Sequence, residues 1–308
     1  MKILLATQKP FAAEAVAGIK KIFTEKGYET AVLEKYSDNS ELTGAVSDAD
    51  AIIIRSDKMT PEVFDAAKKL KIVVRAGAGY DNVDLCAATA HNVVVMNTPG
   101  QNSNAVAELA IAFMIFMSRN QFTPAAGSEI EGKKLGIQAF GNVGCLVCEK
   151  AKALGMQVVA DDPFVCADKI SEGGAIPITS LEDMYSSCDF ISLHIPATPQ
   201  TVKSIGYDLI TRMPKNGVLV NTARKEIIDE DGLEKALESR PDLKYITDVM
   251  PDNYEELKAK FGLRVFATPK KMGAQTKEAN VNAGLAAAHQ IVNFFESGCT
   301  KFQVNKNK

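Results

Sequence analysis

The stretch Lys134–Gly144, which reads KLGIQAFGNVG, decides the fold of this chain. Its first part, Leu135–Ala139, is an apolar run of strand length, and a turn leads from it into a helix that begins near Asn142. In such a turn Gly141 lets the backbone approach a pyrophosphate, and Gly144 lets the helix pack on the strand. The helix N-terminus offers free N–H groups to phosphates. The stretch therefore predicts a dinucleotide-binding unit in which the phosphates meet Phe140, Gly141, Asn142, Val143 and Gly144.

An acidic pair follows the next expected strand. Gln157–Ala160 runs into Asp161-Asp162-Pro163, and Asp162 lies 18 residues after Gly144. An acid near that distance accepts hydrogen bonds from the adenosine ribose hydroxyls, and two adjacent carboxylates would repel a ribose phosphate. The cofactor expected is therefore NAD rather than NADP. Two features weaken the match: Ala139 replaces the usual first glycine, and the acidic pair could simply cap a turn before Pro163.

The composition is that of an ordinary globular protein, with 46% hydrophobic and 24% charged residues. A length of 308 residues suggests about two domains. The net charge of -3 provides no basic field for a nucleic acid or an anionic membrane. No signal peptide is recognisable, and the most apolar window, Leu109–Met117, is too short to span a bilayer. We expect a cytoplasmic protein that binds neither nucleic acid nor membrane.

The six cysteines are scattered along the chain, which is typical of reduced thiols. Cys145 and Cys148 form a CxxC, but neither a second pair nor a nearby histidine accompanies them. Both fall on the first turns of the expected dinucleotide helix, where small apolar side chains pack. No metal site is expected.

Short apolar runs alternate with helical patterns along the whole chain, which predicts parallel sheets with right-handed crossovers. Eleven strands are too many for one open sheet, so we expect an α/β protein of two doubly wound, Rossmann-like domains with a cleft between them. The expected strands are Lys2–Ala6, Thr30–Leu33, Ala51–Arg55, Lys71–Arg75, Val93–Met96, Lys134–Ala139, Gln157–Ala160, Phe190–Leu193, Val218–Asn221, Tyr245–Asp248 and Val265–Thr268.

The division between the domains is expected near Asn97–Gly100. Residues 1–98 and 284–308 would form a substrate-binding domain, and residues 99–283 the NAD-binding domain. The segment Asn102–Arg119 is apolar on every face, which predicts a core helix or, on one face, a subunit interface. The last helix, near Gln275–Ser297, is expected to cross back to the first domain.

Several motifs occur along the chain in an order that is specific for one family. They are IIIRSDKMT (52–60), RAGAGYDNVDL (75–85), NTPGQNSNAVAELA (97–110), the glycine turn, CDFISLHIPATPQT (188–201), NTARKEIIDE (221–230) and GAQTKEA (273–279). The chain resembles the D-isomer-specific 2-hydroxyacid dehydrogenases. Within them it is most similar to the short-form D-3-phosphoglycerate dehydrogenases that carry lysine in place of the catalytic histidine.

This resemblance implies roles for individual residues. Arg224 matches the family's catalytic arginine, whose guanidinium can fork onto a carboxylate and polarise the neighbouring carbonyl. The backbone of Gly77, Ala78 and Gly79 would cradle the substrate carboxylate, with Asn102 as a further contact. A substrate phosphate would meet Arg55, Ser56 and Lys58. Positions beside the cofactor are matched by His194, Pro196, Thr222, Ala223 and Asp248.

The chain departs from the family at the general acid/base. The usual histidine would stand in Thr268–Ala274, TPKKMGA, but only Lys270 or Lys271 can take its place, depending on the direction of counting. The usual glutamate partner is also replaced, by Asn253. A lysine base needs its pKa brought down from about 10.4, which neighbouring cations would do and a glutamate would oppose.

The resemblance implies NAD-dependent oxidation of 3-phospho-D-glycerate to 3-phosphohydroxypyruvate, the first step of L-serine biosynthesis, by a homodimer formed through the NAD-binding domain and the 102–119 helix. No C-terminal regulatory domain is expected. Two alternatives stay open: another D-2-hydroxyacid dehydrogenase, acting on glyoxylate, hydroxypyruvate or D-lactate, and a catalytically silent NAD-binding interaction protein.

Overall fold

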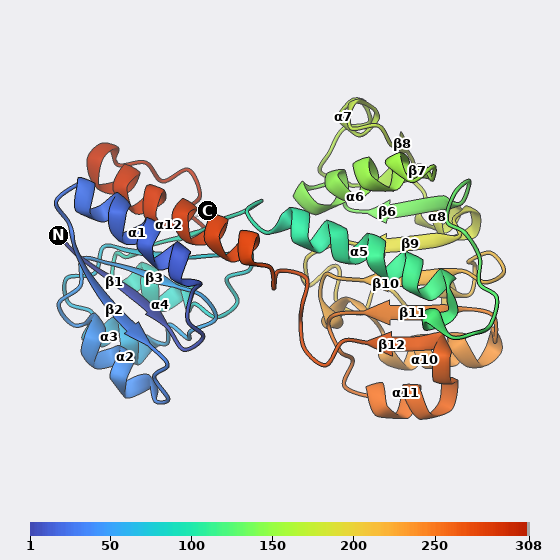
Figure 1. The fold of residues 1–308 in the computed structure, drawn as a ribbon, viewed down its shortest axis with the longest axis horizontal. Helices are drawn as coiled ribbons and strands as arrows, with labels where there is room; N and C mark the ends of the chain where they lie inside the picture. Colours follow the sequence, from blue (N-terminus) through green and yellow to red (C-terminus); the bar gives the residue numbers. More distant parts are fainter. Residues whose placement is uncertain (307–308) are drawn as a thin grey trace. The chain divides into compact units, whose positions relative to one another are not determined.

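The computed structural model describes residues 1–306 and divides the chain into two compact units (Figure 1). The first unit comprises Met1–Asn102 and the chain from Thr276 onward, and the second comprises Ser103–Gln275. These boundaries differ by a few residues from the expected ones, because the last helix belongs to the first unit over its whole length. Within residues 1–306, no helix is both long and apolar enough to cross a membrane.

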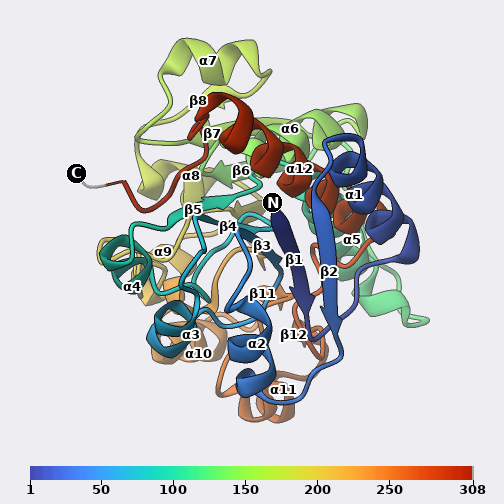
Figure 2. The same ribbon diagram turned by 90° about the vertical axis from the view of Figure 1, so that its left-hand side faces the viewer.

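The first unit is built on a five-stranded parallel sheet of order β2-β1-β3-β4-β5. Its strands are β1 (Lys2–Thr7), β2 (Glu29–Glu34), β3 (Ala51–Ile54), β4 (Ile72–Arg75) and β5 (Val94–Asn97). Helices α1 (Ala13–Glu25) and α12 (Lys277–Ser297) pack together on one face (Figure 2). The other face is covered by α2 (Asn39–Val46), α3 (Pro61–Ala66) and α4 (Leu85–Ala90). The expected doubly wound arrangement is thus present.

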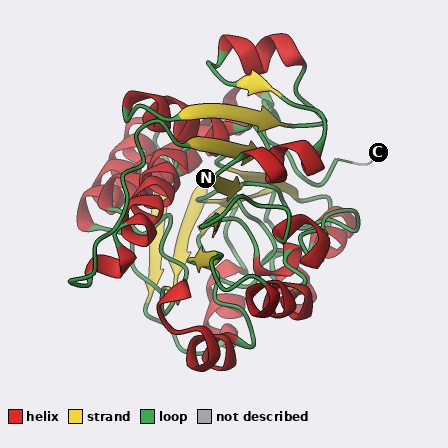
Figure 3. Ribbon diagram, turned by 90° about the vertical axis from the view of Figure 1, so that its right-hand side faces the viewer, coloured by secondary structure: helices red, strands yellow, loops and turns green. Residues whose placement is uncertain are grey.

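The second unit contains a seven-stranded parallel sheet of order β12-β11-β10-β9-β6-β7-β8. Figure 3 views the molecule from the side of this unit, with strands in yellow and helices in red. Its strands are β6 (Lys134–Gln138), β7 (Gln157–Asp161), β8 (Ile176–Pro177), β9 (Phe190–Leu193), β10 (Val218–Asn221), β11 (Lys244–Thr247) and β12 (Val265–Ala267). One face packs against α5 (Ser103–Ser118) and α6 (Asn142–Ala153). The other packs against α8 (Leu181–Ser187), α9 (Tyr207–Ile210) and α10 (Glu230–Ser239). Helix α11 (Tyr254–Phe261) packs into the same core as α10, and α7 (Ala167–Glu172) packs into the core beneath α5 and α6.

All eleven expected strands are present, and α5 is largely buried, as a core helix should be. The sequence pattern does not reveal β8, because two residues are too few to form a recognisable run. Three short 3-10 helices complete the fold: η1 (Asn120–Phe122), η2 (Lys225–Ile227) and η3 (Gly262–Arg264). In a doubly wound sheet, ligands bind at the carboxyl ends of the strands near the point where the strand order reverses, which here lies between β6 and β9.

Candidate functional site

The residues expected around the cofactor lie along the carboxyl edge of the seven-stranded sheet. Backbone hydrogen bonds continue the sheet one residue beyond its strands: His194 N–H donates to Gln138 O at 3.0 Å, and Thr268 N–H to Thr247 O at 3.1 Å. Because neighbouring strands run parallel, their ends follow the sheet order. From one side to the other, the edge therefore presents Lys271, Asp248, Arg224, His194, the glycine turn and Asp162.

The glycine turn has the geometry that its sequence predicts. A Cβ on Gly144 would stand 2.3 Å from the carbonyl oxygen of Ala139, so the helix can approach the strand only with glycine there. A Cβ on the exposed Gly141 would meet nothing within 4 Å, which leaves its backbone open to a ligand. Ala139 has a φ of 77°, the left-handed conformation that the missing glycine would adopt freely.

Asp162 holds the turn from the neighbouring strand. One of its carboxylate oxygens accepts the N–H of Phe140 at 2.8 Å, and the other accepts the N–H of Phe164 at 2.8 Å. The capping and cofactor roles are compatible, because each carboxylate oxygen can accept a second hydrogen bond. Burial and the charge of Asp162 raise the pKa of Asp161. The side chain of Phe140 is buried, so only its backbone is available to a ligand.

His194 follows β9 and is a neutral group. Its Nε2 lies 2.9 Å from the hydroxyl of Ser192, and desolvation lowers the pKa of His194 to about 4. An imidazole with this pKa is uncharged near neutral pH, so His194 can orient a ligand by hydrogen bonding but cannot supply a positive charge. Pro196 is exposed two residues later.

Two basic side chains converge on one carbonyl at the end of β10. Arg224 Nη1 donates to the carbonyl oxygen of Ala223 at 2.9 Å, and Lys271 Nζ donates to the same oxygen at 3.2 Å. Lys270 and Lys271 are both exposed, but the hydrogen bond at Lys270 is to its backbone carbonyl, from the Thr268 hydroxyl at 2.7 Å. The geometry therefore joins Lys271, rather than Lys270, to Arg224.

Asp248 is the buried acid of this edge. Its Oδ2 accepts the N–H groups of Met272 at 3.0 Å and Gly273 at 2.6 Å. Burial raises its pKa, whereas the Gly273 N–H and the charge of Lys271 lower it. Within the described chain, Asp248 Oδ1 and the hydroxyl of the buried Thr222 have no hydrogen-bond partner, so both can serve a ligand.

In the first unit, the expected carboxylate cradle follows β4. Gly77 has a φ of 149°, and its Cβ position is filled by the guanidinium of Arg75, whose Nη1 lies 1.4 Å from where a Cβ would stand. Only glycine leaves room for this guanidinium. The Asn97 side chain donates to Ala78 O at 2.6 Å and holds the cradle from β5. Arg75 opens the RAGAG motif, but the motif alone does not show that its guanidinium lies against Gly77.

The residues expected to bind the substrate phosphate follow β3, and their side chains point in different directions. Arg55 is turned inward: its Nη1 donates to Lys9 O at 3.1 Å, its Nη2 bonds Asn280, and its guanidinium lies 5.2 Å from the centre of the Phe11 ring. Ser56 and Lys58 are exposed.

The remaining sequence features are Asn102 and the CxxC pair. Asn102 is the last residue of the first segment of unit one and is partly buried. Cys145 and Cys148 face the α6 packing surface, and burial raises the pKa of Cys148 to about 11, so this thiol stays protonated.

Comparison with known proteins identifies the family. The family model described as "D-isomer specific 2-hydroxyacid dehydrogenase, catalytic domain" matches residues 6–305. This chain belongs to that family. Among curated dehydrogenases, it is 36% identical over 282 residues to D-3-phosphoglycerate dehydrogenase 2, chloroplastic, of Arabidopsis thaliana (86% of this chain, 45% of the relative). It is also 36% identical over 315 residues to the D-3-phosphoglycerate dehydrogenase of Archaeoglobus fulgidus (95% and 57%). The chain thus spans about half the length of these dehydrogenases.

A solved dehydrogenase structure matches over the full length. It is the NAD+-bound 3-phosphoglycerate dehydrogenase of Entamoeba histolytica, with a TM-score of 0.91 and 47% identity over 100% of this chain and 99% of that one.

Proposed function

We propose that this chain is an NAD-dependent dehydrogenase that oxidises 3-phospho-D-glycerate to 3-phosphohydroxypyruvate, the first step of L-serine biosynthesis. Family membership supports the general chemistry of a 2-hydroxy acid. The names of the relatives in Arabidopsis thaliana and Entamoeba histolytica support the phosphorylated substrate and, for the second, the cofactor.

The residues of the second unit fit NAD. The open backbone at Gly141 and the N-terminus of α6 suit a pyrophosphate, and Asp162 suits the adenosine ribose. Asp248 Oδ1 and the Thr222 hydroxyl are buried groups without a hydrogen-bond partner in the described chain, which suits the polar substituent of a nicotinamide. Bound NAD would accept the hydride from the substrate carbon, beside His194, Pro196 and Ala223.

The single observation that carries the proposal is the convergence of Arg224 and Lys271 on the Ala223 carbonyl. In this proposal the Arg224 guanidinium binds the substrate carboxylate and polarises the reacting carbonyl. Lys271 removes the hydroxyl proton during oxidation and returns it in the reverse direction. The neighbouring guanidinium opposes a second positive charge on Lys271, whereas the Asp248 carboxylate, which interacts with the same amine, favours one.

In the first unit, the Gly77–Gly79 backbone and Arg75 form a group that suits a carboxylate or phosphate. Ser56 and Lys58 offer exposed donors, with Asn102 as a further contact. We include Arg55 as well, because its guanidinium still has N–H groups beyond those used by Lys9, Pro10 and Asn280.

An NADH-consumption assay with phosphohydroxypyruvate, hydroxypyruvate, pyruvate and glyoxylate tests the proposal. The proposal requires the highest kcat/KM for phosphohydroxypyruvate. A preference for glyoxylate, hydroxypyruvate or pyruvate would assign the chain to another branch of the family. NADH binding without turnover of any of the four acids would identify a silent NAD-binding protein.

We further propose that the enzyme is cytoplasmic and a homodimer formed through the NAD-binding domain and α5. The six cysteines are free, which suits a reducing compartment. The strip of α5 that its own unit leaves partly exposed includes Ile115 and Phe116, which suits an apolar contact. Light scattering during size-exclusion chromatography would give twice the 33.2 kDa chain mass for a dimer.

A further inference from the structure

Asp57 is a buried carboxylate at the carboxyl edge of the five-stranded sheet, with 2% of its surface exposed. It accepts three hydrogen bonds. Oδ1 accepts the N–H of Gln8 at 2.7 Å and the hydroxyl of Tyr36 at 2.7 Å, and Oδ2 accepts the N–H of Arg55 at 3.0 Å. These donors follow β1, β2 and β3 respectively. One carboxylate therefore joins three strand ends.

The loop that contains Asp57 is also held from its other side. Asn82 Nδ2 donates to the carbonyl oxygens of Arg55 at 3.2 Å and Asp57 at 2.6 Å. Met59 N–H donates to Asn82 O at 3.0 Å. The backbone of residues 55–59 is thus fixed by bonds on both sides, while the side chains of Ser56 and Lys58 remain exposed.

We propose that Asp57 is a positioning residue that fixes the Arg55–Lys58 backbone in the shape that presents Ser56 and Lys58 to the phosphate of the substrate. This inference rests on the proposed function. Asp57 touches no substrate in this account, since its carboxylate is buried and its charge would repel a phosphate. Asp57 acts through the backbone of residues 55–58. If this backbone shifts, Ser56 and Lys58 are misplaced and bind the substrate phosphate much more weakly.

Two substitutions separate positioning from general stability. In Asp57→Asn, the new amide can keep an oxygen toward Gln8 and Tyr36 but then turns an N–H donor toward the N–H of Arg55, so the bond that shapes the loop is lost. In Tyr36→Phe, the carboxylate loses one buried donor but keeps the bond to Arg55. The second variant is therefore a matched control.

The readout is KM for phosphohydroxypyruvate relative to KM for hydroxypyruvate, which lacks the phosphate. We expect Asp57→Asn to raise this ratio roughly tenfold, with kcat nearly retained, and Tyr36→Phe to leave it unchanged. An unchanged ratio in Asp57→Asn, or an equal rise in Tyr36→Phe, overturns the proposal.

Hydrogen exchange of the wild-type protein supplies a test that needs neither variant to fold. The Arg55 amide must exchange slowly, because its bond to Asp57 lies in a buried site. Exchange at the rate of an exposed loop overturns the positioning role. Failure of the proposed function gives a different result: the wild type would not turn over phosphohydroxypyruvate, which removes the phosphate part of the inference whatever the exchange result.

Discussion

Ala139 is held in a conformation that costs energy. Its φ of 77° places an L-residue in the left-handed region, at a cost of roughly 1–2 kcal/mol. We therefore expect Ala139→Gly to raise the free energy of unfolding by about 0.5–1 kcal/mol, after subtracting the greater chain entropy of unfolded glycine. Urea unfolding measures this change. A destabilised glycine variant would show that the methyl group makes favourable contacts that outweigh the strain.

His194 gives a pH dependence with a definite sign. Its folded pKa of about 4 lies below the unfolded value of about 6.5, so folding favours the neutral ring. The contribution to stability is present above pH 6.5 and is lost as the pH falls from 6.5 toward 4. Replacement by glutamine should remove this part of the pH dependence in urea unfolding. A wild-type His194 resonance that titrates near pH 6.5 by NMR would contradict the assignment.

At the scale of elements, the junction of β6 and α6 has two glycines with different tasks. Gly144→Ala places a Cβ 2.3 Å from the Ala139 carbonyl oxygen, so we expect the free energy of unfolding to fall by about 1–3 kcal/mol. Gly141→Ala meets no atom within 4 Å and should alter stability by less than about 0.5 kcal/mol. It should nonetheless weaken NADH binding, measured by fluorescence titration. Equal stability losses in both variants would contradict this division.

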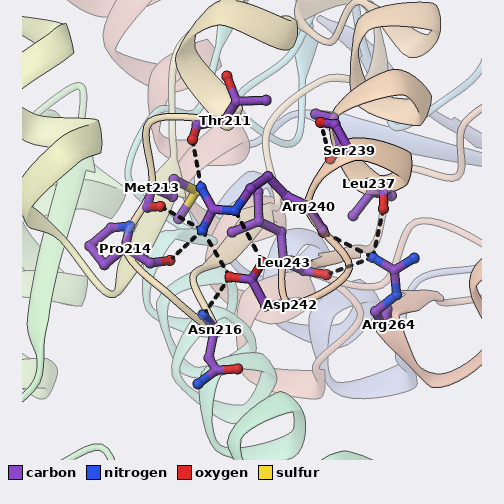
Figure 4. Close-up of polar contacts among 11 residues, drawn as sticks. Thr211, Met213, Pro214, Asn216, Leu237, Ser239, Arg240, Asp242, Leu243 and Arg264 are labelled. Carbon is purple, nitrogen blue, oxygen red and sulfur yellow. Dashed lines mark hydrogen bonds and ion pairs between the residues drawn. The ribbon is translucent and has the colours of Figure 1, made fainter.

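The amino-terminal side of the same sheet is held by a network around Arg240 (Figure 4). Arg240 binds Asp242 through two nitrogens, at 3.0 and 2.8 Å, and donates to Thr211 O at 2.7 Å and Met213 O at 3.1 Å. These bonds join the segments that enter β10 and β11. The network lies at the amino-terminal ends of the strands, whereas the candidate site lies at their carboxyl ends. We therefore assign it a structural role.

This network predicts acid sensitivity. The hydrogen bond from Arg240 lowers the pKa of Asp242 to about 2, below the unfolded value of about 3.9. Its stabilisation is therefore present above pH 4 and disappears as the pH falls from 4 to 2. Asp242→Asn should cost about 1–3 kcal/mol at pH 7 and much less near pH 2.

The matched control is Asp252→Asn, which breaks an exposed ion pair with Lys225. Because solvent screens this exposed pair, the substitution should have little effect on the free energy of unfolding at either pH. A loss at pH 7 in Asp242→Asn no larger than that of the control would contradict a structural role for the network.

For the whole molecule, sequence patterns predict the two sheets well. A buried parallel strand is a continuous apolar run, which can be recognised without knowing which strands pair with it. Contacts between distant segments could not be read in this way. Arg55 turns inward because Phe11 and Asn280 lie beside it, and neither is near it in sequence. Likewise, the C-terminal tail covers the edge of β5 through Asn305, whose side-chain oxygen accepts the N–H of Val95 at 2.9 Å.

The candidate site shows the same limit. The order of the strand ends follows from the fold class, so the motifs could place the proposed cofactor residues along one edge of the sheet. The sequence could not decide between Lys270 and Lys271. The segment Thr268–Ala274 has one residue more than the family's motif, so alignment from its start points to Lys270 and alignment from its end points to Lys271. Arg224 and Lys271 both donate to the Ala223 carbonyl, and this contact between distant segments is the reason why we propose Lys271.

The most direct test of the account is the turnover of phosphohydroxypyruvate by Lys271→Ala and Lys270→Ala. If Lys271 transfers the proton, its replacement lowers kcat by roughly 10²–10⁴-fold, while NADH affinity is retained. The Lys270 variant should keep kcat within a few-fold of the wild type. Wild-type kcat in Lys271→Ala, or a larger loss in Lys270→Ala, would contradict the account.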